Sequence, residues 1–269
     1  MNFRVEYRHP MPLDIPSLES AMLEMPQEPA PVVHRFGPGV YIREVRLPAD
    51  AFVIGHEQTR EHLNIMLTGR VRMADGTILQ APMIFTGKPG RKAGFIEEEC
   101  VWLNVYATEE TDVEKLEATY LCKSDAFHAH KENRVGIEAA QEDYSQMLKD
   151  LGVSAELVQA QSENLDDQIP MPHGSYGFQV APSRIHGRGI FACSTYEAGD
   201  LIGNARINGM RTPLGRFTNH SGEPNARMEW RGSDICLIAS RIIPGQCGGQ
   251  LGEEITVDYR VSVEVACRV

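Results

Sequence analysis

The sequence predicts a mainly β protein in two parts, joined by a helical segment. Residues 32–106 are short apolar runs broken by turn signals such as Ala74-Asp-Gly76, a pattern typical of successive strands. Apolar residues recur at three- and four-residue spacing across 134–167, which indicates helix. Near the end, Gly252–Tyr259 alternates between apolar and polar residues, as a strand does. The expected segments are 1–125, 126–171 and 172–269.

The first segment is predicted to be an antiparallel barrel. The runs at Val40–Val45, Leu63–Leu67 and Cys100–Tyr106 are rich in β-branched and aromatic residues, which favour strands. Their even spacing is typical of an antiparallel barrel.

The stretch Gly55–Gly69, which reads GHEQTREHLNIMLTG, resembles the first motif of the cupin family. Pro89-Gly90 and Asn104 resemble parts of the second motif. The resemblance implies a cupin-like barrel.

Cupin metal sites use a His-x-His pair, a Glu and a further His from the second motif. This chain has His56, Gln58 and, later, His62, and its second-motif region reads Arg91-Lys92-Ala93. A catalytic metal needs three or four convergent N or O ligands, and the chain offers two good candidates. We therefore expect no metal; a cupin-type small-molecule binder or metal enzyme is an alternative function for the chain.

The connector is predicted to hold two helices. Gly152 ends the first, Ser154 caps the second, and the prolines of Ile169–Pro172 break the pattern. The apolar stripe includes Val135, Ile137, Ala140, Tyr144 and Met147. It indicates packing within the chain, and a seam in a homo-oligomer is the competing interpretation.

Three short motifs follow in the last segment. Ile185–Ala192 reads IHGRGIFA, in which paired glycines let the backbone turn tightly or approach a ligand. Arg216–Ala226 reads RFTNHSGEPNA, and Gly252–Tyr259 reads GEEITVDY. Each motif alone is typical of an ordinary turn or strand; the specific information lies in their order.

In this order the motifs resemble the SET-domain protein lysine methyltransferases. The resemblance implies a β-clip fold, S-adenosylmethionine as cofactor, and a protein substrate with an accessible lysine. Tyr259 would be the catalytic residue, placed beside the transferred methyl group. The cofactor-binding residues implied by the match are His186, Gly187, Arg188, Gly189, Arg216, Asn219 and His220.

The resemblance implies methyl transfer to a protein lysine. The chemistry suits this expectation, because an in-line displacement gains much of its rate from alignment of the two reactants. A non-catalytic module that binds cofactor or partner is the alternative. This alternative is supported by the short stretch between Ala192 and Arg216, where family members carry a longer insert. Residues Pro244–Gly252 resemble an expanded form of a shorter turn.

Charge and composition narrow the function classes. The net charge is −11, and the part after Pro172 carries +1, so clustered cations for nucleic acid are not expected. The six cysteines form no Cys-x-x-Cys pair, which favours a reducing compartment and a cytoplasmic location. No apolar run reaches the length of a membrane span.

Overall fold

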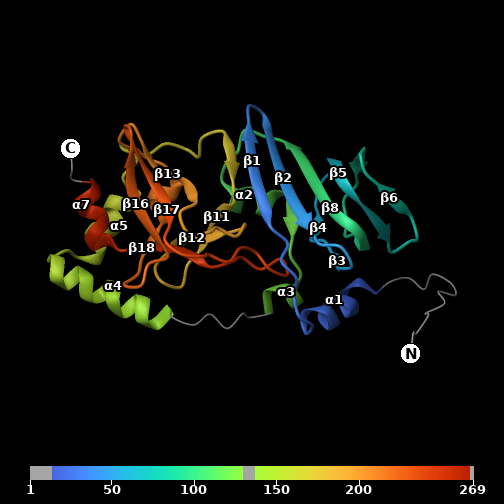
Figure 1. Ribbon diagram of the computed structural model, residues 1–269, viewed down its shortest axis with the longest axis horizontal. Coiled ribbons are helices and arrows are strands. Elements are labelled where there is room, and N and C mark those ends of the chain that lie inside the picture. Colours follow the sequence, from blue (N-terminus) through green and yellow to red (C-terminus); the bar gives the residue numbers. More distant parts are fainter. Residues whose placement is uncertain (1–13, 130–136, 267–269) are drawn as a thin grey trace.

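The computed structural model describes residues 14–129 and 137–266. Figure 1 shows two β-rich halves arranged along the long axis, with some of the helices along the lower edge of the view. The strands of the first half are β1 (Val32–Gly37), β2 (Val40–Leu47), β3 (Phe52–Ile54), β4 (Glu57–Gln58), β5 (His62–Met73), β6 (Ile78–Gln80), β7 (Met83–Gly87), β8 (Ala93–Ala107) and β9 (Leu121–Cys122). Its helices are α1 (Ile15–Leu23), α2 (Val113–Tyr120) and α3 (Asp125–Ala129).

The main sheet of this half follows the order β10-β1-β2-β8-β5-β6, in which β10 (Gly174–Tyr176) comes from the second half, with β3 also paired to β8 and β7 to β5. All of these pairings are antiparallel, as the sequence predicted. Strand β5 shifts register against β8 around Gly69, whose φ is 94°. A Cβ there would lie 2.7 Å from Cys100 Cα, so glycine permits the close crossing.

The connector contains α4 (Ile137–Leu151) and α5 (Ala155–Glu163), which confirms the two predicted helices. Gly152 has a φ of 63°, and the Ser154 side chain accepts a hydrogen bond from Leu157 N. Tyr144 and Met147 of the apolar stripe are buried within the chain. Val135 lies outside the described residues.

The second half contains two four-stranded sheets, ordered β11-β12-β18-β15 and β14-β13-β17-β16. Its strands are β10 (Gly174–Tyr176), β11 (Phe178–Pro182), β12 (Arg188–Ala192), β13 (Leu201–Ile207), β14 (Met210–Arg211), β15 (Asn219–His220), β16 (Ala226–Arg231), β17 (Asp234–Ala239) and β18 (Glu254–Val257). Its helices are α6 (Pro213–Phe217) and α7 (Tyr259–Ala266).

The predicted strand over Gly252–Tyr259 is shorter than expected. Strand β18 ends at Val257, and Tyr259 is the first residue of α7. The Asp258 carboxylate accepts a hydrogen bond from Arg260 N at 2.9 Å. This is the arrangement of an N-cap, which starts a helix and so ends the alternation.

One hydrophobic core is shared by the two halves. Phe36, Tyr41 and Tyr106 of the barrel belong to the same buried cluster as Ile190 and Leu237 of the second half. Strand β10 also extends the barrel sheet by pairing with β1. The halves are therefore joined by both sheet and core.

No helix within the described ranges is long and apolar enough to cross a membrane.

Candidate binding cavity

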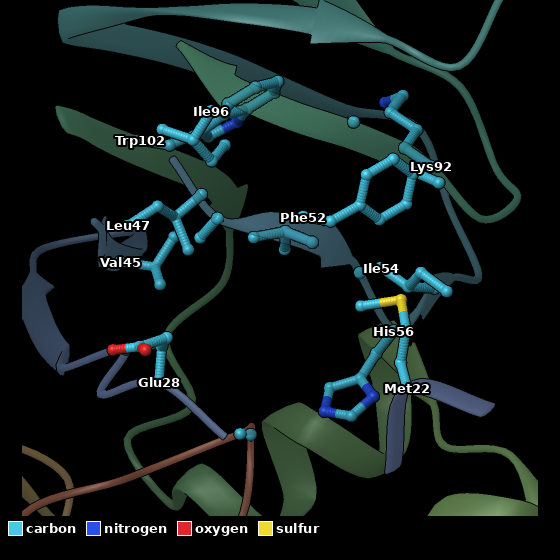
Figure 2. Close-up of a pocket in the computed structure, with 18 of the residues that line it drawn as sticks. Met22, Glu28, Val45, Leu47, Phe52, Ile54, His56, Lys92, Ile96 and Trp102 are labelled. Carbon is cyan, nitrogen blue, oxygen red and sulfur yellow. The ribbon is translucent and has the colours of Figure 1, made fainter. Parts of the chain in front are cut away.

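A cavity of about 460 Å³ lies in the barrel half, against the inner face of the main sheet. Its volume falls in the range of about 300–1,000 Å³ that is usual for small-molecule sites. Figure 2 shows Val45 and Leu47 on one side of the space, and Ile54 and Met22 on the other. The second half contributes Gln246, Gly248 and Gly249 to its wall.

Most of the wall is apolar, and strand register explains why. Val45 of β2 lies opposite Trp102 of β8, and Trp102 lies opposite Met66 of β5. Paired residues point to the same face of a sheet, so these three side chains form one apolar row across three strands. Leu47 and Ile96 extend the apolar surface.

A polar row lies next to it. Arg43 of β2 is paired with Asn104 of β8, and Asn104 with Asn64 of β5. All three line the cavity. The inner face of the barrel thus changes from apolar to polar within one two-residue step of each strand.

The Asn64 amide is held in one orientation and keeps an unused donor. Its Oδ1 accepts hydrogen bonds from Trp102 Nε1 at 2.8 Å and from Asn104 Nδ2 at 2.9 Å. Two N–H donors identify this atom as the oxygen. Its Nδ2 is buried and has no hydrogen-bond partner, in a side chain that is only 1% exposed.

His62 contributes a second unpartnered nitrogen. Its Nδ1 lies 3.0 Å from the carbonyl oxygen of Arg60, so Nδ1 carries the proton and donates. Nε2 is buried without a partner. A Cβ on Gly87 would collide with both Asn64 Nδ2 and His62 Nε2, so the glycine leaves room for these two atoms.

Arg43 supplies a cation to the polar row. Its Nε is buried and unpartnered. The carboxylate of Glu117, which feels the charge of Arg43, forms an ion pair with Lys123 Nζ at 2.8 Å. Although burial acts to raise it, the pKa of Glu117 is lowered by Lys123 and Arg43, so that carboxylate is an anion paired elsewhere.

His56 lies at the edge of the cavity beside α1 and α3. Its ring meets Phe127 edge-on, with centroids 4.7 Å apart, and its Nδ1 is buried without a partner. Burial, assisted by the charge of Arg43, lowers the pKa of His56 to about 3. The imidazole is therefore neutral at physiological pH.

Two elements close the cavity. Helix α1 is fixed by Arg91, whose guanidinium donates to both carboxylate oxygens of the buried Glu19, at 2.8 and 2.5 Å. The loop containing residues 246–249 is held by hydrogen bonds from Ala30 N to Gln246 O and from Gly248 N to Glu28 O. The expanded turn that the sequence singled out thus packs over the barrel.

The residues present do not fit the metal that cupin enzymes hold. Within the described part of the chain, no three His, Cys, Asp or Glu side chains are grouped to hold a metal ion. Arg91 of the second-motif region is engaged with Glu19. The expectation of a metal-free barrel stays a prediction, which elemental analysis of the purified protein tests.

The residues of the predicted cofactor site come together in the second half, away from this cavity. The Asn219 amide nitrogen donates to His186 O, Arg188 O and Glu254 Oε1, at 3.2, 3.1 and 2.7 Å. A Cβ on Gly189 would collide with Glu254, whereas Gly187 faces open space. The Asn219 amide is thus used to join segments of the chain.

The two arginines of the predicted site flank one ring. The guanidinium carbons of Arg188 and Arg216 each lie 4.7 Å from the centroid of Phe217. Arg188 also forms an ion pair with Glu114 at 2.6 Å. Arg216 Nε is buried without a partner.

Tyr259 and His220 are enclosed by helix α4. His220 Nε2 lies 2.7 Å from Asp143 of that helix, and His220 Nδ1 accepts from Tyr259 N at 3.0 Å. The Tyr259 hydroxyl donates to Thr218 O at 2.8 Å. Burial raises the pKa of Tyr259 far above its ordinary value. The hydroxyl expected to face a substrate is bound to the main chain.

No family model matches the chain, and no curated protein matches it. Solved structures that resemble it include a cupin domain from Bordetella pertussis, 17% identical over 31% of this chain and 98% of that chain, with a TM-score of 0.25. An acetylacetone dioxygenase from Acinetobacter johnsonii is 11% identical over 40% and 78%, with a TM-score of 0.24. An oxalate oxidase bound to glycolate is 12% identical over 51% and 72%, with a TM-score of 0.26.

These neighbours agree with the mainly β, cupin-like architecture. They correct the expected activity: the enzymes among them are cupin enzymes and not methyltransferases. Lysine methyl transfer with S-adenosylmethionine as cofactor is therefore the wrong expectation. The physical reason is that the polar atoms of Asn219, His220 and Tyr259 form hydrogen bonds within the chain.

Sequence reasoning named His56, His62 and Asn104 but missed Arg43 and Asn64. The signal for Arg43 was present: it shares a strand face with Tyr41 and Val45, where alternation predicts an apolar residue. The row it forms with Asn64 depends on strand register, which sequence alone did not define.

Proposed function

We propose that the chain is a cupin-type binding protein for a small organic molecule, held in the barrel cavity without a metal. This proposal is supported mainly by a largely apolar cavity of about 460 Å³ that has buried nitrogens without hydrogen-bond partners at its polar side, on Arg43, Asn64 and His62. Buried polar atoms without partners carry a free-energy penalty of about 1–3 kcal/mol each. A ligand that satisfies them removes the penalty and fills the apolar space at once.

We assign the second half a non-catalytic role in this proposal. Its loop at residues 246–249 forms part of the cavity wall, and its core is continuous with the barrel. The SET-like motifs then serve to tie β12, β15 and β18 together through Asn219 and Glu254. The half closes and supports the binding site.

The test is ligand binding to a protein whose cavity has been filled. A panel of eight-carbon acid, alcohol and amide is screened by thermal shift and calorimetry. We expect at least one member to raise the Tm of the wild type, and Val45→Trp to abolish that effect because the indole occupies the apolar space. Val101→Trp is the matched control, since Val101 is paired with Arg46 on the alternate face of the sheet.

Absence of binding by the whole panel would contradict the proposal. Equal binding by Val45→Trp and the wild type would place the ligand outside the barrel.

A further inference from the structure

The cavity has two chemically different ends, and the difference defines a ligand class. One end is lined by Val45 and Trp102 of the apolar row, together with Leu47 and Ile96. The other end is the row of Arg43, Asn104 and Asn64. A molecule that matches both ends is amphipathic, with an apolar body and a compact polar head.

The unpartnered atoms of the polar row are hydrogen-bond donors. Arg43 Nε and Asn64 Nδ2 are both buried without a partner, and neither atom is able to accept a hydrogen bond. The complementary head must therefore present acceptor oxygens. Two adjacent acceptors on one planar group match the geometry of a guanidinium.

The charge of the polar row favours an anion. Glu117 is paired with Lys123, and Glu19 is paired with Arg91. The other carboxylates of the lining, Glu28 and Asp50, are exposed to solvent. Among the described residues, no carboxylate lies within ion-pair distance of Arg43. Its charge acts on Glu117 from farther away, but Glu117 is paired with Lys123, so the two cations and one anion leave one positive charge in excess.

Lys92 is the second cation of the lining, and it lies at a different place. Figure 2 shows Lys92 beside Phe52, whose side chain is 38% exposed. Both cations are half-buried, but Lys92 precedes β8 at the Phe52 edge of the cavity, whereas Arg43 belongs to the row that crosses β2, β8 and β5. A head group at Arg43 leaves the apolar body of the ligand against Val45 and Leu47.

We propose that the ligand of the barrel cavity is a monocarboxylic acid with an apolar body, whose carboxylate is bound by Arg43 and Asn64. This inference rests on the proposed function and adds the chemical class of the ligand. Arg43 contributes charge and N–H donors, and Asn64 contributes its free Nδ2 donor. His62 Nε2, an acceptor in the tautomer described above, lies beside Gly87 and is not assigned to the carboxylate.

The test compares octanoate with octanol, which share the apolar chain and differ in the head. Calorimetry at neutral pH is expected to show the wild type binding octanoate about tenfold or more tightly than octanol, as charge-assisted hydrogen bonds imply. Arg43→Gln should lose this preference and keep its octanol binding. Arg43→Lys keeps the charge and should retain part of the preference.

Three further variants locate the head group. Asn64→Asp keeps the acceptor for Trp102 and Asn104 but replaces the free donor by a carboxylate oxygen, so it should weaken octanoate and spare octanol. Arg46→Gln, on the outer face of the same strand, is the matched control and should change neither affinity. Lys92→Gln should leave most of the preference in place.

Each result separates the ligand class from the proposed function. Equal affinity of the wild type for octanoate and octanol would overturn the carboxylate inference while leaving a binding cavity. Loss of the preference in Lys92→Gln but not in Arg43→Gln would overturn the assignment of Arg43. Binding of neither probe would overturn the proposed function and the inference with it.

Discussion

Among single residues, the cavity lining combines two cations, Arg43 and Lys92, with the neutral imidazole of His56. Burial lowers the pKa of His56 to about 3 and that of His34 to about 4. Both imidazoles are therefore neutral at neutral pH.

The buried histidines predict that stability falls as the solution is acidified. The pKa of each is lowered in the folded state from an ordinary value of 6.5. Below pH 6.5 the unfolded chain binds protons that the folded chain does not bind. The contribution of these histidines to the free energy of unfolding should thus be fully present above that pH. It should decrease toward pH 4, by up to about 1.4 kcal/mol per pH unit for each histidine.

Urea unfolding between pH 7 and pH 5 measures this slope, above the range in which ordinary carboxylates titrate. His34→Gln should lower the slope, since His34 is fully buried against the Tyr41 hydroxyl at 2.8 Å. His173→Gln is the control, because His173 is exposed. A slope unchanged by His34→Gln would show that folding does not lower the pKa of His34.

Residue types were predicted better than residue roles. His56, His62 and Asn104 were identified as barrel residues from the motif spacing, and all three line the cavity. Tyr259 was predicted to end a strand, but the Asp258 cap starts a helix there. Roles depend on which atoms remain unpaired, and that is decided by contacts between residues far apart in the sequence.

For secondary-structure elements, the loop at residues 246–249 links the two halves at the cavity. Gly248 and Gly249 have φ values of 56° and 78°, in the left-handed region that favours glycine. A Cβ on Gly249 would lie 3.2 Å from Phe127 and 3.7 Å from His56 Nε2. The sequence indicated that this turn is longer than usual. The additional residues contact Phe127 and residues 28–30 of the barrel half.

This contact predicts a ligand-binding effect for Gly249→Ala. The left-handed backbone should cost about 1–2 kcal/mol of stability, and the added methyl should push Phe127 and His56 at the cavity edge. Octanoate affinity is therefore expected to fall. Gly232→Ala is the matched control, because Gly232 has a φ of 67° with nothing near its Cβ position; it should lose stability alone.

Denaturant unfolding and calorimetry on both variants separate the two effects. If Gly249→Ala lost stability but kept full octanoate affinity, the loop would not be part of the binding site.

The strands were predictable because alternation and turn signals are local. Strands β2, β5 and β8 all contain the runs predicted from sequence. The pairing of β10 with β1, and the parallel pairing of β15 with β18, join segments distant in sequence. No local pattern reports such pairings.

For the whole molecule, the shared core predicts that the two halves unfold together. Phe36 and Tyr106 of the barrel pack in the same cluster as Phe178 and Leu237 of the second half. The chain has two tryptophans, Trp102 in β8 and Trp230 in β16. Each therefore reports on one half.

Fluorescence-monitored unfolding of Trp102→Phe and Trp230→Phe tests this prediction. The midpoint that each variant shows by fluorescence should match its own midpoint by circular dichroism, as in a two-state transition. A remaining-tryptophan signal that changes well before or after the backbone signal would show that the halves unfold separately. The barrel half and the second half would then be independent folding units.

The central claim is that an apolar acid lies in the barrel with its carboxylate at Arg43. The most direct measurement is a crystal structure with octanoate that carries bromine at its far end. The account predicts an anomalous bromine peak among Val45, Leu47 and Ile96, with the carboxylate within hydrogen-bond distance of Arg43 and Asn64. A bromine peak in the second half near Arg188 and Arg216, or a carboxylate at Lys92 with Arg43 unbound, would contradict it.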